Sequence, residues 1–297
     1  MITVHDLTLT YPSGKGVFDL DFSISEGQVM GYLGPNGAGK TTTIRALMGF
    51  MQPDAGRCTI NGLDCIKKAP EIQKLLGYIP GEITFLDNMN GDEFLRFMLA
   101  MRKRGKDTNR QKQLLDMFEL DPKGKIRKFS KGMKQKLGIV TAFMHDPEVY
   151  VLDEPTSGLD PLMQNRFVEL VLSEKKRGKT ILMSSHSFEE VEKTCDSAII
   201  IREGRIIRQD DVRALKDTQR RVYLLKPEDT GTARNLLETA GFKVSTVTAG
   251  ALEVLVTGEQ VDRLIKTAAQ FTVYDIDVKN QTLEEVFMQY YGKEGKV

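Results

Sequence analysis

A glycine-rich stretch followed by lysine and threonine carries the clearest chemistry in this 297-residue chain. Its spacing is G-x-x-x-x-G-K-T, in which glycines let backbone N–H groups curl round phosphates while the following helix adds the positive end of its dipole. Lys40 is placed to reach the β- and γ-phosphates of a nucleotide, and the Thr41 hydroxyl is placed to ligate Mg²⁺. The residues expected to bind the nucleotide here are Gly34, Pro35, Asn36, Gly37, Ala38, Gly39, Lys40, Thr41 and Thr42.

Two acidic residues, Asp153 and Glu154, follow the apolar segment 149–152. A buried strand in a parallel sheet delivers such carboxylates to the carboxyl edge, where open α/β sheets bind ligands. Asp153 is then placed to hold Mg²⁺, directly or through water, and Glu154 is placed to polarise an attacking water. An Asp-Glu-Pro sequence alone is more typical of a solvated turn, but the phosphate loop upstream favours one shared site for phosphate, metal and water.

The segments around these motifs alternate between strand and helix patterns. Residues 28–33 form an apolar run that leads into the loop, and residues 43–50 have a helical pattern that leads out of it. Later strands alternate with helices, which predicts an α/β fold with a mainly parallel sheet. The strand-like segments in residues 1–33 suit an antiparallel sheet, and residues 92–101 and 110–120 carry apolar residues at helical spacing. The later strands are expected at 149–153, 180–184 and 198–201.

The pattern changes near the end of the chain, where short segments follow the order strand, helix, strand, strand, helix, strand. This order suggests a small ferredoxin-like α+β domain. A terminal helix is expected at residues 282–291, which begin with a capping-box-like Thr-x-x-Glu. We therefore expect one domain at residues 1–216 and an accessory domain at residues 217–297. The accessory domain carries no catalytic set, and the sequence leaves its role open.

Four further motifs, in order along the chain, make it resemble the ATP-binding subunit of an ABC transporter. Tyr11 stands where that family stacks an aromatic ring on adenine, and residues 129–135 stand where it has its Leu-Ser-Gly-Gly-Gln signature. Residues 157–160, Ser-Gly-Leu-Asp, match its D-loop, and His186 matches its switch histidine. The resemblance covers the first three quarters of the chain. It implies a P-loop NTPase core with an antiparallel β subdomain and a helical subdomain at about residues 82–147.

The resemblance also implies roles and partners. His186 is implied to contact the γ-phosphate and to act in catalysis with Glu154, while Ser130 and Gly132 are implied to reach ATP held by a second copy. One loop and one signature in a chain then imply a homodimer or pseudo-dimer with two composite sites, closed by ATP and opened by hydrolysis. The implied function is the ATPase of a membrane transporter of an exporter-like branch, attached to separate membrane permease subunits at the cytoplasmic face of the cell membrane.

The chain departs from the family pattern at two places. Its signature reads Phe-Ser-Lys-Gly-Met, so Lys131 and Met133 stand where the family has glycine and glutamine. Lys131 either adds positive charge near the γ-phosphate or points to solvent, and we favour solvent. The second departure is the slot of the family's glutamine that senses Mg²⁺ and water, which here holds Gly81 followed by Glu82. Glycine lacks the side chain for this role, and whether Glu82 takes it is left open.

Composition agrees with a soluble cytoplasmic subunit. The 42 basic and 41 acidic residues give a net charge of +1, which provides no electrostatic case for a nucleic-acid partner. No apolar run approaches the about 20 residues of a membrane-spanning helix, and the first residues lack a signal-peptide pattern. Cys58, Cys65 and Cys195 have no metal or redox spacing. The alternative, a soluble ABC ATPase acting in translation or DNA repair, fits less well because the chain has one loop and no long coiled-coil insertion.

Overall fold

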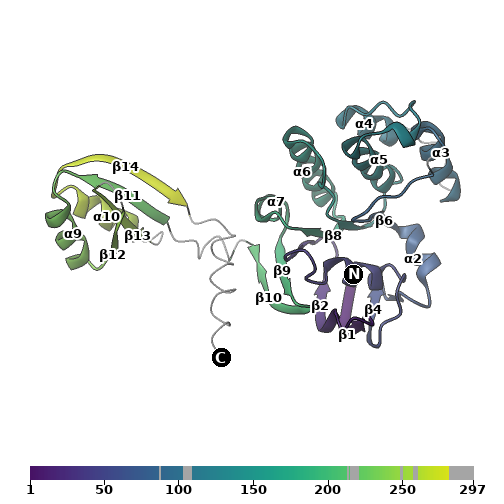
Figure 1. Cartoon of the computed structure of the whole chain (residues 1–297), viewed down its shortest axis with the longest axis horizontal. Helices are drawn as coiled ribbons and strands as arrows, with labels where there is room; N and C mark the ends of the chain where they lie inside the picture. The colour runs from purple at the N-terminus through teal and green to yellow at the C-terminus, as the bar shows by residue number, and fades with distance from the viewer. Residues whose placement is uncertain are drawn as a thin grey trace. The chain divides into compact units, whose positions relative to one another are not determined.

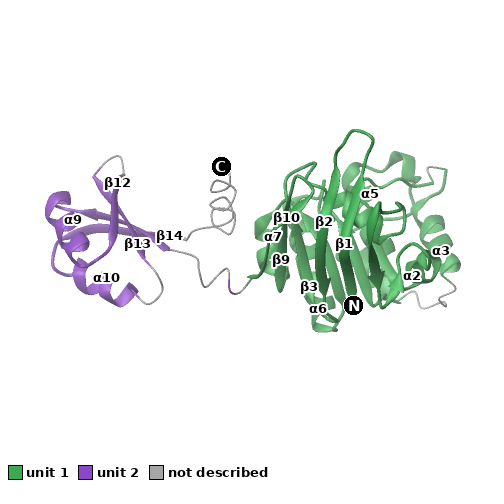
Figure 2. Cartoon of the chain, turned by 90° about the horizontal axis from the view of Figure 1, so that it is seen from below, with its two compact units in different colours: residues 1–212 green, residues 213–297 purple. Residues whose placement is uncertain are grey.

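The computed structural model describes residues 1–86, 88–102, 109–212, 214, 221–247, 250–256 and 260–280. The chain divides into two compact units, residues 1–212 and residues 213–297 (Figure 2). The domain boundary predicted at residue 216 and the terminal helix predicted at residues 282–291 both lie outside the described residues. Within the described ranges, no helix is long and apolar enough to cross a membrane.

Unit 1 is built on a six-stranded sheet in which five strands run parallel and β10 pairs antiparallel with β9 at one edge. Every residue of β3, β7 and β8 is buried, as expected for central strands of a parallel sheet. The parallel direction brings Leu33, Asp153 and Ser185 to the same edge. In spatial order the strands are β10 (Arg205–Asp211), β9 (Ser197–Arg202), β3 (Val29–Leu33), β8 (Thr180–Ser185), β7 (Val149–Asp153) and β6 (Leu76–Ile79).

A second, antiparallel sheet in unit 1 confirms the prediction for the start of the chain, except that residues 29–33 join the large sheet as β3. The two sheets share one apolar core, in which the ring centroids of Phe22 and Tyr32 lie 5.7 Å apart. This core fixes the loop after β3 between the sheets. In spatial order the antiparallel strands are β2 (Gly16–Ile24), β1 (Ile2–Thr10), β4 (Ala55–Ile60) and β5 (Leu63–Asp64).

The helices of unit 1 include a group, α3, α4 and α5, that lies to one side of the sheets (Figure 1). Asn90 and Glu93 form a capping box at the start of α3, which explains why that helix begins where it does. The helix predicted at 110–120 ends earlier, at residue 117, because Glu119 adopts a positive φ of 50°. The bounds are α1 (Lys40–Leu47), α2 (Ala69–Leu75), α3 (Gly91–Met101), α4 (Asn109–Met117), α5 (Lys131–Phe143), α6 (Pro161–Lys176) and α7 (Phe188–Thr194).

Unit 2 has the strand, helix, strand, strand, helix, strand order of a ferredoxin-like fold. Its four strands form an antiparallel sheet in the spatial order β12, β13, β11, β14. Leu225, Leu237, Val254 and Leu264 are fully buried in a core that α9 and α10 share with the sheet. The bounds are β11 (Arg221–Pro227), α9 (Thr230–Thr239), β12 (Lys243–Val247), β13 (Ala251–Val256), α10 (Val261–Ala268) and β14 (Val273–Asn280).

Candidate nucleotide site

The predicted phosphate loop connects β3 to α1 through a turn that only glycine fits at two positions. Gly37 and Gly39 have φ values of 81° and 112°, in the left-handed region that other residues rarely adopt. A Cβ on Gly39 would also lie 2.7 Å from Cγ1 of Val17, and one on Gly34 would lie 2.4 Å from the carbonyl oxygen of Ile201. The glycines therefore allow the chain to turn tightly into the N-terminus of α1.

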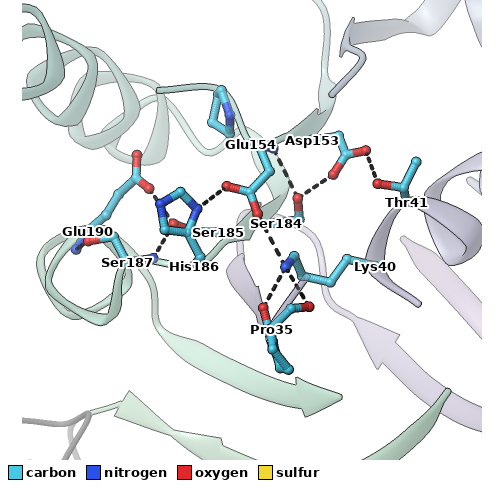
Figure 3. A network of polar contacts seen from close by, with 12 residues as sticks. Pro35, Lys40, Thr41, Asp153, Glu154, Ser184, Ser185, His186, Ser187 and Glu190 are labelled. Carbon is cyan, nitrogen blue, oxygen red and sulfur yellow. Dashed lines mark hydrogen bonds and ion pairs between the residues drawn. The ribbon is translucent and has the colours of Figure 1, made fainter. Parts of the chain in front are cut away.

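Lys40 is almost fully buried, with 6% of its side chain exposed. Its Nζ donates to the carbonyl oxygens of Gly34 at 2.5 Å and Pro35 at 3.3 Å, and lies 3.2 Å from Oε1 of Glu154 (Figure 3). A buried ammonium group needs such partners, because its desolvation is costly without them. The structure thus brings together the predicted lysine of the loop and the predicted carboxylate of the water site.

Asp153 lies where three elements of unit 1 meet. It is fully buried, and its carboxylate accepts from the Thr41 hydroxyl at 2.7 Å and from the Ser184 hydroxyl at 2.5 Å (Figure 3). Asp153 and Ser184 face each other because β7 and β8 pair in that register. A carboxylate and a hydroxyl are hard oxygen ligands of the kind Mg²⁺ prefers. The two residues predicted as metal ligands, Thr41 and Asp153, therefore lie together and fit a magnesium ion.

Glu154 lies between Lys40 and His186. One carboxylate oxygen is paired with Lys40, and the other lies 2.6 Å from Nδ1 of His186 (Figure 3). The Glu154 backbone has a φ of 48°, and its N–H donates to the Ser184 hydroxyl at 3.0 Å. His186 itself is 67% exposed at the end of β8. The arrangement places a carboxylate, a lysine and an imidazole around one accessible point.

Tyr11 lies beside the last residue of the phosphate loop. Its hydroxyl is 3.4 Å from the Thr42 hydroxyl and 3.4 Å from the sulfur of Met51, and its ring is partly buried against the core of unit 1. The predicted aromatic residue for adenine is therefore next to the loop, with part of its ring accessible.

The signature residues lie against the D-loop. The Ser130 hydroxyl caps α5 by accepting from the Met133 N–H at 3.2 Å, and a Cβ on Gly132 would lie 3.1 Å from the Gly158 carbonyl oxygen. Lys131 is exposed, and its aliphatic stem passes over Gly158. A Cβ on Gly158 would lie 3.1 Å from the carbons of that stem. The preference for a solvent-facing Lys131 agrees with this exposure. Gly132 thus lies against the D-loop of its own chain, whereas the Ser130 side chain is hydrogen bonded to the first turn of α5.

Gly81 and Glu82 are both exposed, and Gly81 borders Asp153. A Cβ on Gly81 would lie 3.0 Å from Oδ2 of Asp153, so this glycine provides close backbone approach rather than a side chain. Nearby, burial and then the charge of Asp153 raise the pKa of Tyr78 to about 12. The position that holds a glutamine in the family therefore packs directly against the carboxylate.

Sequence reasoning missed two residues that support the site. Ser184 joins Asp153 to the Glu154 backbone through its hydroxyl, and Gln135 donates from a buried amide to the Pro155 carbonyl oxygen at 2.6 Å. A serine at the carboxyl end of a predicted central strand is a weak signal for such a role. Gln135 lies within the signature segment 129–135, but the sequence does not reveal its partner, which lies on the turn that follows β7.

Known proteins are similar to this chain in sequence and in fold. The family profile described as ABC transporter matches residues 17–157. The ABC transporter ATP-binding protein NatA of Bacillus subtilis is 34% identical over 74% of this chain and 93% of its own length. The daunorubicin resistance ATP-binding protein DrrA3 of Streptomyces coeruleorubidus is 30% identical over 100% of this chain and 97% of its own length.

A solved structure described as the ATP-binding subunit of an ABC transporter superposes with a TM-score of 0.67 at 32% identity. It covers 73% of this chain and 92% of the other. Fold and site together define a P-loop ATPase. The chain belongs to the ATP-binding proteins of the ABC transporter family, and the resemblance inferred from its motifs is confirmed. It is an ATP-hydrolysing subunit for ATP-powered transport.

Proposed function

We propose that this ATPase binds ATP with Mg²⁺ in unit 1 and passes the energy of hydrolysis to membrane permease subunits that export their substrate. The observation that carries the proposal is Glu154, held between Lys40 and His186 one residue after the Asp153 carboxylate. Phosphoryl transfer to water needs positioning and charge neutralisation more than covalent chemistry. This cluster supplies groups for both.

Each charged group of the cluster has a distinct role. Thr41 and Asp153 hold Mg²⁺, which neutralises charge on the phosphate oxygens when it is bound. Lys40 exchanges its contacts with the loop carbonyls for charge-assisted contacts with the β- and γ-phosphates. Glu154 accepts the proton of the attacking water, and His186 orients that carboxylate and contacts the γ-phosphate.

We also propose that the working unit is a dimer, with Ser130 and Gly132 of one copy completing the ATP site of the other. The chain has one loop and one signature, and Gly132 of the signature lies against the D-loop of its own chain. A face formed by the signature and the D-loop is then free to meet the phosphates held by a second copy. ATP closes this dimer and hydrolysis opens it.

Export at the cytoplasmic face of the cell membrane is supported by relatives rather than by the site. One relative that spans the whole chain is named for daunorubicin resistance, and removal of a drug from the cell is one source of resistance. The substrate pocket belongs to the permease. The transported compound is therefore not encoded in this chain.

Co-purification from membranes tests the proposal. The tagged full-length chain, expressed in its own cells, should bring down a polytopic membrane protein after detergent extraction. The amount of this partner that is recovered should differ between ATP with Mg²⁺ and ADP. Recovery of ribosomes or DNA in place of a membrane protein would contradict the proposal and favour the soluble class of ABC ATPase.

A further inference from the structure

Glu190 is a buried carboxyl group that the proposed function leaves unused. It lies in the first turn of α7, 8% exposed, on the far side of His186 from the phosphate loop (Figure 3). Burial raises the pKa of Glu190; hydrogen bonds with Ser185 and Thr156 oppose this rise, and the charge of Glu154 adds to it. A buried carboxyl is costly to keep unless its hydrogen bonds serve the fold or the site.

The hydrogen bonds of Glu190 enclose the segment that carries His186. The Ser185 hydroxyl donates to Oε2 of Glu190 at 2.6 Å, and the same hydroxyl accepts from the Ser187 N–H at 2.9 Å. The Ser187 hydroxyl in turn accepts from the Glu190 N–H at 3.3 Å. These three bonds close a ring around the backbone on both sides of the histidine.

His186 depends on that backbone for its position. Two thirds of its side chain is exposed, and its described hydrogen bond is the one to Glu154. An exposed ring has few packing neighbours, so the segment beneath it sets the place of the imidazole. A shift of residues 185–187 would therefore carry Nδ1 away from Glu154.

Glu190 also lies near the segment on the other side of the water site. It lines one surface hollow together with Thr156, which lies two residues after Glu154 on the turn between β7 and the D-loop. His186 lines the same hollow, so Glu190 lies close to the segments on both sides of the water site.

We propose that Glu190 is a positioning residue for ATP hydrolysis, which holds the His186 segment in place beside Glu154 through Ser185. The inference rests on the roles proposed above for Glu154 and His186. The hydrogen bonds of Glu190 are with Ser185 and Ser187, on either side of the histidine. It acts through the segment that carries His186.

Steady-state kinetics with matched variants provides the first test. Glu190→Ala should lower kcat by about 10-fold or more, since misplacement by about 1 Å costs up to about 10²-fold, while ATP affinity stays within about 2-fold. Glu190→Gln should recover most of kcat, because its amide oxygen still accepts from Ser185. Glu189→Ala is the control: this neighbour on α7 is exposed and pairs with Lys193, so its removal should leave kcat unchanged.

Nuclear magnetic resonance of labelled imidazoles provides a readout that a purely structural role would not move. The chain has three histidines, His5, His145 and His186, so the His186 signal is identified by one substitution. Glu190→Ala should shift that signal and leave the other two in place. Glu190→Gln should keep it near its wild-type position.

A further test removes the Ser185 hydroxyl, through which Glu190 is proposed to act. Ser185→Ala should reproduce the loss of kcat and the shifted His186 signal, and the double variant with Glu190→Ala should be no worse than either alone. Wild-type kcat with an unmoved His186 signal in Glu190→Ala would overturn the proposal. Equal losses of ATP affinity and melting temperature in Glu190→Ala and Glu190→Gln would also overturn it, since they indicate a structural role. If His186→Ala hydrolyses ATP normally, the role proposed for His186 fails, while the imidazole signals still report on Glu190.

Discussion

At the scale of residues, the geometry of Glu154 depends on contacts from two separate segments, the start of α1 and the end of β8. Its carboxylate is shared between Lys40 of α1 and His186 after β8, and its backbone N–H is fixed by Ser184. The left-handed φ of 48° turns the chain away from β7 at this residue. Such a backbone is costly for a residue other than glycine, and it is retained where surrounding contacts determine it.

Lys40→Ala should sharply weaken ATP binding. The substitution removes a charged donor to the phosphates, and charge-assisted hydrogen bonds are worth about 1.5–3 kcal/mol. The ATP dissociation constant of the purified variant should therefore rise by about 10-fold or more. Titration calorimetry measures it directly. An unchanged ATP affinity would remove Lys40 from the phosphate site.

Glu154→Gln should abolish most hydrolysis while ATP still binds. The amide keeps the shape of the side chain and loses its ability to accept a proton, so the rate should fall by about 10²-fold or more. ATP-bound chains should accumulate as a closed dimer, which size-exclusion chromatography detects. Near-normal turnover would mean that another group activates the water, with Glu82 and His186 the first to test.

The sequence predicted the pairing of Thr41 with Asp153, because a loop after one central strand and an acid at the end of another reach the same sheet edge. It did not predict Ser184 or Glu190. The partner of Ser184 is set by the register of β7 and β8, which brings it next to Asp153, 31 positions away in the chain. The partners of Glu190 are set by the packing of α7. Local patterns carry no information about that register.

At the scale of elements, a buried ion-pair network ties α4 to α6 and β7. Glu174 of α6 is fully buried; Arg110 of α4 and Arg177 donate to its carboxylate, and the Tyr150 hydroxyl donates to it at 3.2 Å. Burial, and then the charge of Glu174, raises the pKa of Tyr150. Arg110 links the helical group to the large sheet at a point distant in sequence from the signature.

Arg110→Ala should therefore destabilise unit 1 by about 1.5–3 kcal/mol, the usual worth of hydrogen bonds to a charged group, with Arg177 and Tyr150 still partnering Glu174. Urea unfolding measures the change. The matched control is Arg166→Ala on α6, whose pair with Glu169 is exposed and should contribute less than about 1 kcal/mol. Equal stability of the two variants would mean that α4 is held by apolar packing alone.

Local sequence patterns predict where a helix lies better than they predict where it ends. The helical spacing of residues 110–120 predicted α4, and Leu114 within the helix and Phe118 just after it are buried as expected. The pattern continues through Leu120 although the helix ends at residue 117. Apolar periodicity records which residues face the core, and it does not record the change in φ at Glu119 that ends the hydrogen-bond ladder.

At the scale of the whole molecule, the proposed dimer can be tested by mixing variants. Ser130→Arg should block hydrolysis by bulk and misplaced charge at the interface, while each chain still binds ATP. The Lys40→Ala variant should be inactive because its phosphate loop binds ATP only weakly. A mixed dimer then has one site with both changes and one with neither, so mixing should restore part of the activity that each variant lacks.

Recovery on mixing would place Ser130 across the interface from Lys40. If the signature acted within its own chain, every site in the mixture would carry one change and no activity would return. Chains carrying Ser130→Arg and Lys40→Ala together serve as the control, because mixing them with either single variant creates no intact site. Activity in that control mixture would contradict the composite arrangement.

The close approach of Gly81 to Asp153 has a consequence for how this chain can be re-engineered. A Cβ at residue 81 would lie 3.0 Å from Oδ2 of Asp153, the same oxygen that accepts from Thr41. Restoring the family's glutamine by Gly81→Gln would therefore require the Asp153 side chain or the backbone at residue 81 to move by a few tenths of an ångström. The effect of that substitution on hydrolysis then depends on how far this carboxylate can move.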